Sequence, residues 1–507
     1  MRHPEHIPGT KDYTQSEARR LLEASAACLK TFDRYGYERI ILPVLERSDI
    51  FLQRSGEEIR SRMYIFADPR GNELCLRPEM TISAARAYLE RMPNRRLPIR
   101  LSYEGSVFRF DKVREGRYRQ FVQAGVEYLG SENRTAADVE AAALALEAVK
   151  QTGLSDFRLL LGDMELAAEF INALPISAPV RSTLLEHYWR KNAFQLLLKR
   201  YAAPPQVADS NDPAARQLAD ILAAIGEDAS RAVVRQILSL FVEKAIGQRD
   251  LDEIAESFLR RFTRRELHLP ADCLGVLEEY IAISGPPDQT LAQLEKLFAK
   301  INGAPGQAFE NAHRRIELLK EMDCLPPSTD FALGFRRGIE YYTGFIFEIH
   351  YEGLGPVSQI CGGGRYDNLI ASLGAPRQIP AVGFAIGVER LLLALERAAA
   401  PVASSDGQAV DAVLARVGNV SEADAWRIAQ ICREAGWRVR ADLDHRKFTT
   451  VLGHASDDNV RFTIIVGEDE LRSRSVKVKD MRRREEQVVA IDNLRQFIAA
   501  CANGEPR

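Results

Sequence analysis

Apolar residues recur every three or four positions in several parts of the chain, which is the period of one face of an α-helix. The segments with this period are 14–35, 81–92, 135–153 and the second half of 380–398. Thr135 is the expected N-cap of the third segment, and Gly153 its end. These segments are predicted to be helices.

Short apolar runs bounded by turn residues predict β-strands between and after those helices. The runs lie at 37–51, 62–80, 98–110, 119–130, 331–335 and 341–351. Pro43 interrupts the first run, which indicates an edge, a bulge or a turn. Asp68–Gly71 is the expected turn of a hairpin within the second run.

The distribution of these patterns predicts the domains. Helical patterns alone fill 182–322, which indicates a helical insertion between two parts of a sheet domain, 1–181 and 323–397. The small, polar, proline-containing segment 398–409 is expected to be a linker. From 410 to 507 strands and helices alternate, which predicts a small α/β domain with a mixed sheet.

Composition adds two constraints. A formal net charge of −3 over 507 residues argues against a wholly basic nucleic-acid binder but leaves room for a local basic face. The seven cysteines are dispersed, with no C-x-x-C pair, as expected for reduced thiols in a cytoplasm. No apolar run reaches the length of a membrane span, and the N-terminus lacks the pattern of a signal peptide, so a soluble cytoplasmic protein is expected.

Cationic side chains are concentrated between two predicted strands, in "FRFDKVREGRYRQF". They are Arg109, Lys112, Arg114, Arg117 and Arg119. Arginine's planar fork suits bidentate contacts to phosphate, so a hairpin with several arginines over a sheet can hold a polyphosphate. The alternative is a solvated charged loop.

Other polar residues stand where a ligand or an ordinary structural role would explain them. Glu79, in "LRPEMT", suits either a helix cap or a ligand ammonium group. Gln123, Gly125 and Glu127 share one strand face, as a pocket or as a solvated polar surface.

Three further features leave the same choice open. The glycines 362–364 suit a tight turn or a close approach to the backbone. Arg390, at the start of an apolar helix, suits a ligand phosphate or an ordinary ion pair. In "FRRGIEYYTGFIFE", residues Arg337, Tyr341 and Tyr342 exceed what a packing strand needs.

The order of these segments resembles the three ordered motifs of class II aminoacyl-tRNA synthetases. The segments "RYGYERIILPVLE", the arginine-bearing hairpin and "GVERLL" carry that resemblance. "PGTKD", "LRPE", "GRYRQF", "RGIEYYTG" and "GGGRYDNL" are similar to the histidyl-tRNA synthetase family, and "GWRVRADL" and "IIVGEDEL" to a class IIa anticodon-binding domain. The resemblance implies an α+β fold with an antiparallel catalytic sheet flanked by helices, a helical insertion and a C-terminal α/β domain.

The resemblance also implies substrates and roles. ATP with Mg²⁺, L-histidine and tRNA-His are the expected partners, in a homodimer without a membrane. Arg109 and Arg337 would act at the reacting carboxylate and α-phosphate. The remaining implied positions are Glu79 and Thr81 for the α-amino group, Gln123, Glu127, Tyr341 and Tyr342 for the rest of histidine, Asp111 and Phe121 for adenine, and Arg117 and Arg390 for the β- and γ-phosphates.

The sequence departs from the family at several positions. Asp111 replaces the usual glutamate that contacts adenine, and Glu340 replaces the usual aspartate. Lys112, Val113 and Arg114 stand where bacterial relatives carry R-P-Q to recognise the extra 5′ guanosine of tRNA-His, so that guanosine is read differently or not at all.

A second family shares the catalytic fold, the regulatory subunit of ATP phosphoribosyltransferase. "LSYEGSVFR", "QFVQAGVEYLG" and "GGRYDNLIASLGAP" are similar to it. That alternative implies a histidine-binding subunit of histidine biosynthesis, with a short-form phosphoribosyltransferase as partner, or a paralogue that charges no tRNA. The retained Arg337 and the C-terminal domain favour the ligase. The basic stretch Leu471–Arg484 suits an RNA backbone or a protected strand edge.

Overall fold

The computed structural model describes residues 6–202, 221, 224–225, 227–241, 269–398, 410–442 and 447–502. The chain forms two compact units, an N-terminal unit (1–12 and 20–403) and a C-terminal unit (13–19 and 404–507). Most of the predicted linker 398–409 lies outside the described residues. No helix among the described residues is long and apolar enough to cross a membrane.

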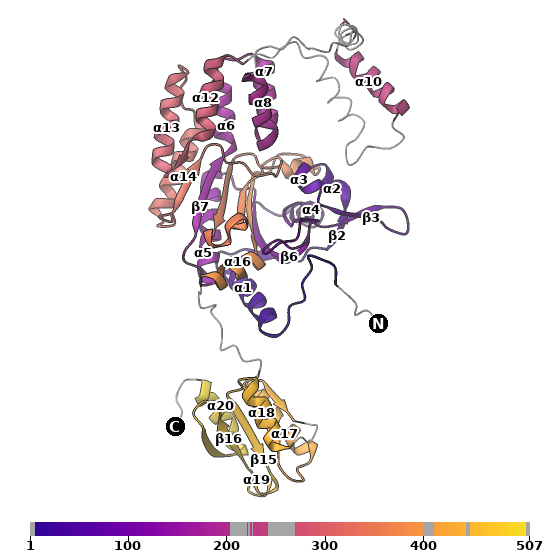
Figure 1. Cartoon of the computed structure of the whole chain (residues 1–507), viewed down its shortest axis with the longest axis vertical. Helices are drawn as coiled ribbons and strands as arrows, with labels where there is room; N and C mark the ends of the chain where they lie inside the picture. Colours follow the sequence, from indigo (N-terminus) through magenta and orange to yellow (C-terminus); the bar gives the residue numbers. More distant parts are fainter. Residues whose placement is uncertain are drawn as a thin grey trace. The chain divides into compact units, whose positions relative to one another are not determined.

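A nine-stranded sheet forms the centre of the N-terminal unit (Figure 1). Its order is β1-β5-β6-β12-β11-β10-β7-β9-β8. Neighbours run antiparallel except for the β1/β5 and β7/β9 pairs. The strands are β1 (Glu38–Arg39), β5 (Ile99–Phe108), β6 (Gln120–Leu129), β7 (Arg158–Asp163), β8 (Ser284–Gly285), β9 (Thr329–Ala332), β10 (Phe345–His350), β11 (Gln359–Arg365) and β12 (Ala381–Gly387).

Helices cover one face of this sheet. α5 (Arg134–Gln151) packs on β10, β11 and β12, and its buried face consists largely of alanines, which allow close contact with the strands. α1 (Gln15–Arg34) reaches the same core through Phe32, whose ring meets Phe384 of β12 edge to face. α16 (Val388–Arg397) packs on β6 and β11. The opposite face carries Gln123, Glu127 and Glu348, beside a smaller apolar cluster that includes Ile99, Leu101 and Leu129.

A smaller antiparallel sheet, β2-β4-β3, stands beside the large one. It comprises β2 (Leu45–Arg47), β3 (Tyr64–Ala67) and β4 (Glu73–Leu76), with α2 (Ser48–Leu52), α3 (Glu57–Arg60) and α4 (Thr81–Arg91). The predicted hairpin is confirmed, with Gly71 at φ 84° in its turn. The predicted interruption at Pro43 is confirmed, because β1 and β2 join different sheets on either side of it. The predicted continuation of the strand to residue 51 is wrong, because α2 follows β2 directly.

Helices also dominate the chain between β7 and β9. They are α6 (Met164–Ala173), α7 (Ala178–Tyr188), α8 (Lys191–Ala202), α10 (Glu227–Phe241), α12 (Ala271–Ala282), α13 (Pro287–Lys300) and α14 (Gln307–Glu321). β8 is a short strand within the predicted helical insertion, and it joins the large sheet beside β9. α14 packs against α5, where Arg315 makes buried ion pairs with Asp138 at 2.8 Å and Asp163 at 2.5 Å.

One local prediction needs correction, and one alternative of another is excluded. The N-cap of α5 is Asn133, whose side chain accepts a hydrogen bond from Ala136 N, and Thr135 lies inside the helix. The glycines 362–364 form the middle of strand β11 and no turn.

The C-terminal unit has the predicted mixed sheet, in the order β14-β13-β15-β16-β17 (Figure 1). Its elements are β13 (Ala412–Arg416), α17 (Glu422–Glu434), β14 (Val439–Ala441), α18 (Phe448–Asp457), β15 (Phe462–Val466), α19 (Glu468–Arg472), β16 (Ser475–Asp480), β17 (Glu485–Ala490) and α20 (Leu494–Ala502). This unit has its own hydrophobic core, in which the ring of Trp437 stacks on that of Phe462 with 4.5 Å between ring centres.

Candidate active site

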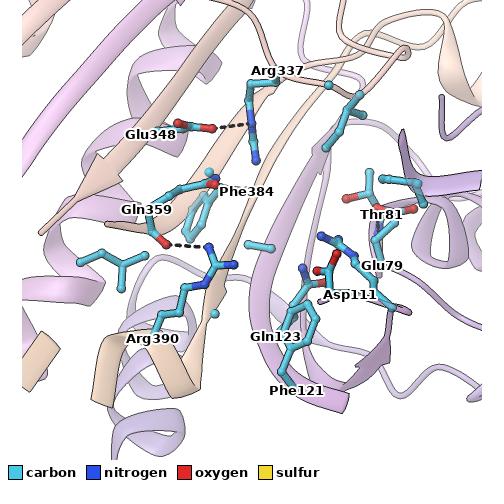
Figure 2. A pocket seen from close by; sticks show the side chains of 18 of the residues that line it. Glu79, Thr81, Asp111, Phe121, Gln123, Arg337, Glu348, Gln359, Phe384 and Arg390 are labelled. Atoms are coloured by element: carbon cyan, nitrogen blue, oxygen red, sulfur yellow. Dashed lines mark hydrogen bonds and ion pairs between the residues drawn. The ribbon is translucent and has the colours of Figure 1, made fainter. Parts of the chain in front are cut away.

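A cavity of about 320 Å³ lies over the polar face of the large sheet. All residues to which the family resemblance assigned a role line it, except Glu127. The lining residues among them are Glu79, Thr81, Arg109, Asp111, Arg117, Phe121, Gln123, Arg337, Tyr341, Tyr342 and Arg390. Of the hairpin cations, Lys112, Arg114 and Arg119 are not among the lining residues. Figure 2 shows Arg337, from the loop before β10, and Arg390, from α16, facing the same space as Glu79, Thr81 and Asp111.

Glycines make room for the large polar side chains of the cavity floor. Glu348 of β10 lies opposite Gly362 of β11, and Glu127 of β6 lies opposite Gly383 of β12. A Cβ on Gly383 would collide with the Glu127 carboxylate. A Cβ on Gly362 would instead meet the guanidinium of Arg337, which lies above Gly362 and pairs with Glu348. The glycines of 362–364 therefore serve close approach, one of the two predicted roles.

Three of the arginines act on one another through their charges. Burial, together with the neighbouring charges of Arg117 and Arg109, lowers the pKa of Arg390 to about 10. The Arg390 guanidinium donates to the carbonyls of Gly116 (2.8 Å) and Gln359 (3.0 Å). Both contacts are to backbone oxygens, unlike the carboxylate partner of an ordinary ion pair. Such a concentration of positive charge suits a polyanion.

Arg337 is fixed at the other side of the cavity. Its Nε lies 3.1 Å from Glu348 Oε1, and its Nη1 donates to the hydroxyl of Tyr342 at 2.9 Å. Burial favours the neutral form, but Tyr342 and Glu348 outweigh it, so the pKa of Arg337 lies above its ordinary value. Glu348 also contacts His350 Nε2 at 2.9 Å. Arg337 is thus held as a cation in a defined orientation before any ligand binds.

Glu79 fills the capping role predicted for it and also lines the cavity. Its carboxylate accepts from the backbone N–H of Thr81 (3.0 Å) and Ile82 (2.9 Å), at the start of α4. The hydroxyl of Tyr341 donates to it at 3.1 Å. Burial raises the pKa of Glu79 despite these bonds and the nearby Arg109. A ligand ammonium group would supply the positive charge that this buried carboxylate needs.

Glu127 lies beneath the cavity, 1% exposed. It accepts hydrogen bonds from the hydroxyls of Tyr103 (2.8 Å) and Tyr366. Burial raises its pKa from 4.5 to about 8, although those hydroxyls oppose the shift. Tyr366 lines the cavity, so it connects Glu127 to the space above. The alternative of a solvated strand face is excluded for Glu127.

The raised pKa of Glu127 predicts a pH dependence of stability. The folded protein keeps a proton that the unfolded chain releases above 4.5, so this contribution is complete below that pH and is lost as the pH rises to about 8. The loss amounts to at most about 1.4 kcal/mol per pH unit. Glu127→Gln should remove it. The urea-unfolding midpoint of the variant should rise relative to wild type between about pH 5 and about pH 8, whereas the exposed Glu132→Gln should run parallel to wild type. A parallel Glu127→Gln curve would refute the shift.

Two cavity atoms lack a hydrogen-bond partner among the described residues. They are Gln123 Oε1 and Arg117 Nε, both buried. A buried polar group without a partner costs free energy unless a ligand or solvent satisfies it. One acceptor and one cationic donor thus remain for a ligand.

Asp111 is held by a residue that the sequence analysis missed. Arg62 Nη1 lies 3.1 Å from Asp111 Oδ1, and Arg62 O accepts from Phe110 N at 2.7 Å. Phe121 lies nearby, with the Arg109 guanidinium 5.4 Å from its ring centre. Glu348 was also missed, although a single acidic residue in the apolar strand "FIFEIH" was a signal for it. No sequence signal indicated Arg62, because Arg62 reaches the cavity only through the packing of the small sheet.

Comparison with known proteins agrees with this geometry. A family model described as histidyl-tRNA synthetase matches residues 9–261 and 229–391, and one for an anticodon binding domain matches 411–500. The histidine–tRNA ligase of Pyrococcus furiosus is 30% identical over 97% of this chain and 98% of its own. This ligase relative favours the ligase over the regulatory subunit.

Solved structures share the fold. Apo histidyl-tRNA synthetase of S. aureus has a TM-score of 0.64 at 21% identity, covering 98% of this chain and 100% of that one. A Bacillus halodurans protein described as ATP phosphoribosyltransferase regulatory subunit/histidyl-tRNA synthetase has a TM-score of 0.63 at 20% identity, covering 91% and 98%. With the family model over most of the chain and the full-length ligase relative, the chain belongs to the histidyl-tRNA synthetase family.

Proposed function

We propose that this chain is a histidine–tRNA ligase that makes histidyl-adenylate in the described cavity and transfers the histidyl group to tRNA-His. The observation that carries the proposal is one cavity lined both by arginines and by buried carboxyl and tyrosine groups. A polyphosphate and a small cationic amino acid match these two kinds of group.

Histidine would occupy the end formed by the carboxyl and tyrosine groups. Glu79 and Thr81 would take its α-amino group, because the Glu79 carboxylate is buried and needs a cation. Tyr341, Tyr342, Gln123 and, through the hydroxyl network, Glu127 would line the imidazole. Imidazole carries a donor and an acceptor at a fixed spacing, so a polar pocket can select it strongly without editing.

ATP would occupy the arginine end. Phe121 would stack on adenine, and Asp111, held by Arg62, would accept from its amino group. Arg109 would meet the α-phosphate, with Arg117 and Arg390 at the β- and γ-phosphates. ATP would enter as its Mg²⁺ complex, the ion being carried by the phosphates; no group of three or more metal-ligating side chains occurs within the described part of the chain.

The reaction then has two steps. A carboxylate oxygen of histidine attacks the α-phosphorus in line, and the bond to the β-phosphate oxygen breaks, so pyrophosphate leaves with the electron pair. Arg109 and Arg337 stabilise the negative charge that builds up at the α-phosphate. Next, the terminal ribose hydroxyl of tRNA, the 3′-hydroxyl in class II enzymes generally, attacks the histidyl carbonyl and AMP leaves. Both steps depend on positioning and charge, with no covalent enzyme intermediate.

The rest of the chain would serve tRNA binding and assembly. Residues 1–181 and 323–397 would form the catalytic domain, 182–322 an insertion and 410–507 the anticodon-binding domain. The large apolar side chains of Ile41 (93% exposed), Leu45 and Phe66 lie on the surface near the small sheet. We propose that a second copy of the chain covers them in a homodimer.

The test is amino-acid-dependent exchange of pyrophosphate into ATP. Histidine alone among the standard amino acids should support exchange, and the same protein should then charge tRNA-His transcripts. Transcripts with and without the extra 5′ guanosine would show how the loop at Lys112–Arg114 treats that nucleotide. Histidine binding by calorimetry with no exchange would contradict the ligase and support the regulatory subunit.

A further inference from the structure

The loop that carries Arg337 is attached at one end to the helices that lie between β7 and β9. This Arg337 loop, residues 333–341, forms most of the connection between β9 and β10 and contains Tyr341 as well. Tyr188, the last residue of α7, donates from its hydroxyl to the carbonyl of Leu333 at 2.7 Å. Tyr188 is 4% exposed, so this contact is shielded from water. One end of the loop is thereby tied to α7.

Arg336 makes a second attachment to the same helices. Its Nη1 donates to the carbonyl of Tyr188 at 2.9 Å, and its Nε donates to Gly334 O at 3.2 Å. The guanidinium carbon lies 4.4 Å from the ring centre of Tyr188 and 4.8 Å from that of Phe194 in α8. The Tyr188 carbonyl belongs to the C-terminal turn of α7, where a cation is favoured.

Glu340 braces the other end of the loop. Its carboxylate lies 3.4 Å from Arg60, at the end of α3, and 3.6 Å from Arg190, between α7 and α8. A Cβ on Gly56 would lie 2.8 Å from Glu340 Cγ, so the glycine leaves room for this side chain. Arg60 and Glu340 are largely buried, at 15% and 20% side-chain exposure, which strengthens their interaction.

Arg337 itself contacts a different set of groups, Tyr342 and Glu348, which face the cavity. Its neighbour Arg336 also borders the cavity, but its hydrogen bond to Tyr188 and its ring contacts are with the helices. We propose that Arg336 and Glu340 are positioning residues, which fix the Arg337 guanidinium in the cavity by anchoring its loop to the α7–α8 helices. The inference rests on the proposed role of Arg337 at the reacting phosphate. By this role, the α7–α8 helices become part of the site at which histidine is activated.

The test is a double-mutant cycle measured by single-turnover adenylate formation. Arg336→Met should lower the rate about 10- to 100-fold, because small displacements of a catalytic group have effects of that size. In an Arg337→Ala background the same change should have little further effect, because its route to the reaction is gone. Arg336→Lys, which retains the charge and loses the planar fork, should recover only part of the rate.

Arg181→Met is a matched control. Arg181 lies in α7, the helix that Arg336 contacts. It donates to the carbonyls of Leu174 (3.1 Å) and Ile176 (3.2 Å), away from the Arg337 loop. It should change the thermal midpoint of unfolding and leave the rate near wild type. If Arg336→Met fails to fold, Glu340→Gln enters the same cycle.

The outcomes separate the two proposals. The positioning role would be overturned if Arg336→Met, or Glu340→Gln in its place, lowered the rate by the same factor with and without Arg337. An unchanged rate in the Arg336→Met protein would also overturn it. A wild-type rate in Arg337→Ala alone would instead contradict the proposed function of Arg337. Loss in both single variants without addition in the double variant would support the inference.

Discussion

Arg337→Ala is expected to lower histidine-dependent pyrophosphate exchange by about 10²- to 10³-fold, the effect of removing a charge-stabilising donor from a transition state. The guanidinium is held by Glu348 and Tyr342 before substrate arrives, so it requires no reorganisation during reaction. Because its contribution should increase as the α-phosphate gains charge, the maximal rate should fall more than the affinity for histidine. Exchange kinetics at varied histidine and ATP would measure both.

Arg337→Lys provides a second test of the same charge. Lysine keeps the cation but cannot contact Glu348 and Tyr342 through one planar fork, so only partial activity should return. Arg314→Ala is the control, because Arg314 lies exposed on α14 and pairs with Glu321 at 3.1 Å, remote from the cavity lining. Exchange within a few-fold of wild type in Arg337→Ala would remove Arg337 from the chemistry and weaken the ligase assignment.

The sequence predicted most of the C-terminal unit and many strands of the large sheet, because these elements carry apolar runs separated by turn residues. It missed β7, whose run "RLLLGD" passes directly into α6 through Asp163. That residue caps α6 with its carboxylate, which accepts from Glu165 N at 2.7 Å. A strand followed at once by a capped helix has no intervening turn sequence for a pattern to detect.

The site was predictable only in part for a similar reason. Arg109, Arg117 and Phe121 belong to one hairpin, so sequence proximity indicated their shared location. Glu348 and Arg62 depend on strand register and on the packing of the small sheet, which local patterns do not specify. The position of Glu127 beneath the cavity follows from the glycine opposite it. Whether the Glu127 side chain is buried or solvated depends on its neighbour on the adjacent strand, Gly383.

Gly362→Ala should reproduce much of the Arg337→Ala defect without removing any functional group. A Cβ at this position would lie 2.6 Å from Arg337 Nη1 and closer still to Cζ and Nη2. All three atoms belong to a single side chain, so the guanidinium would move while the strand keeps its partners. A displacement of about 1 Å can cost about 100-fold in rate, and exchange should fall accordingly.

Two alanine substitutions separate this effect from damage to the sheet. A Cβ on Gly364 would lie 2.7 Å from the backbone oxygen of Phe345, so Gly364→Ala should lower the thermal midpoint of unfolding. A Cβ on Gly275 in α12 would meet no atom of another part of the chain within 4 Å, and Gly275→Ala should leave exchange unchanged. Gly362→Ala should resemble Gly275→Ala in thermal midpoint and Arg337→Ala in exchange rate. If it loses stability as Gly364→Ala does, or retains full exchange, then the space at Gly362 does not determine where Arg337 lies.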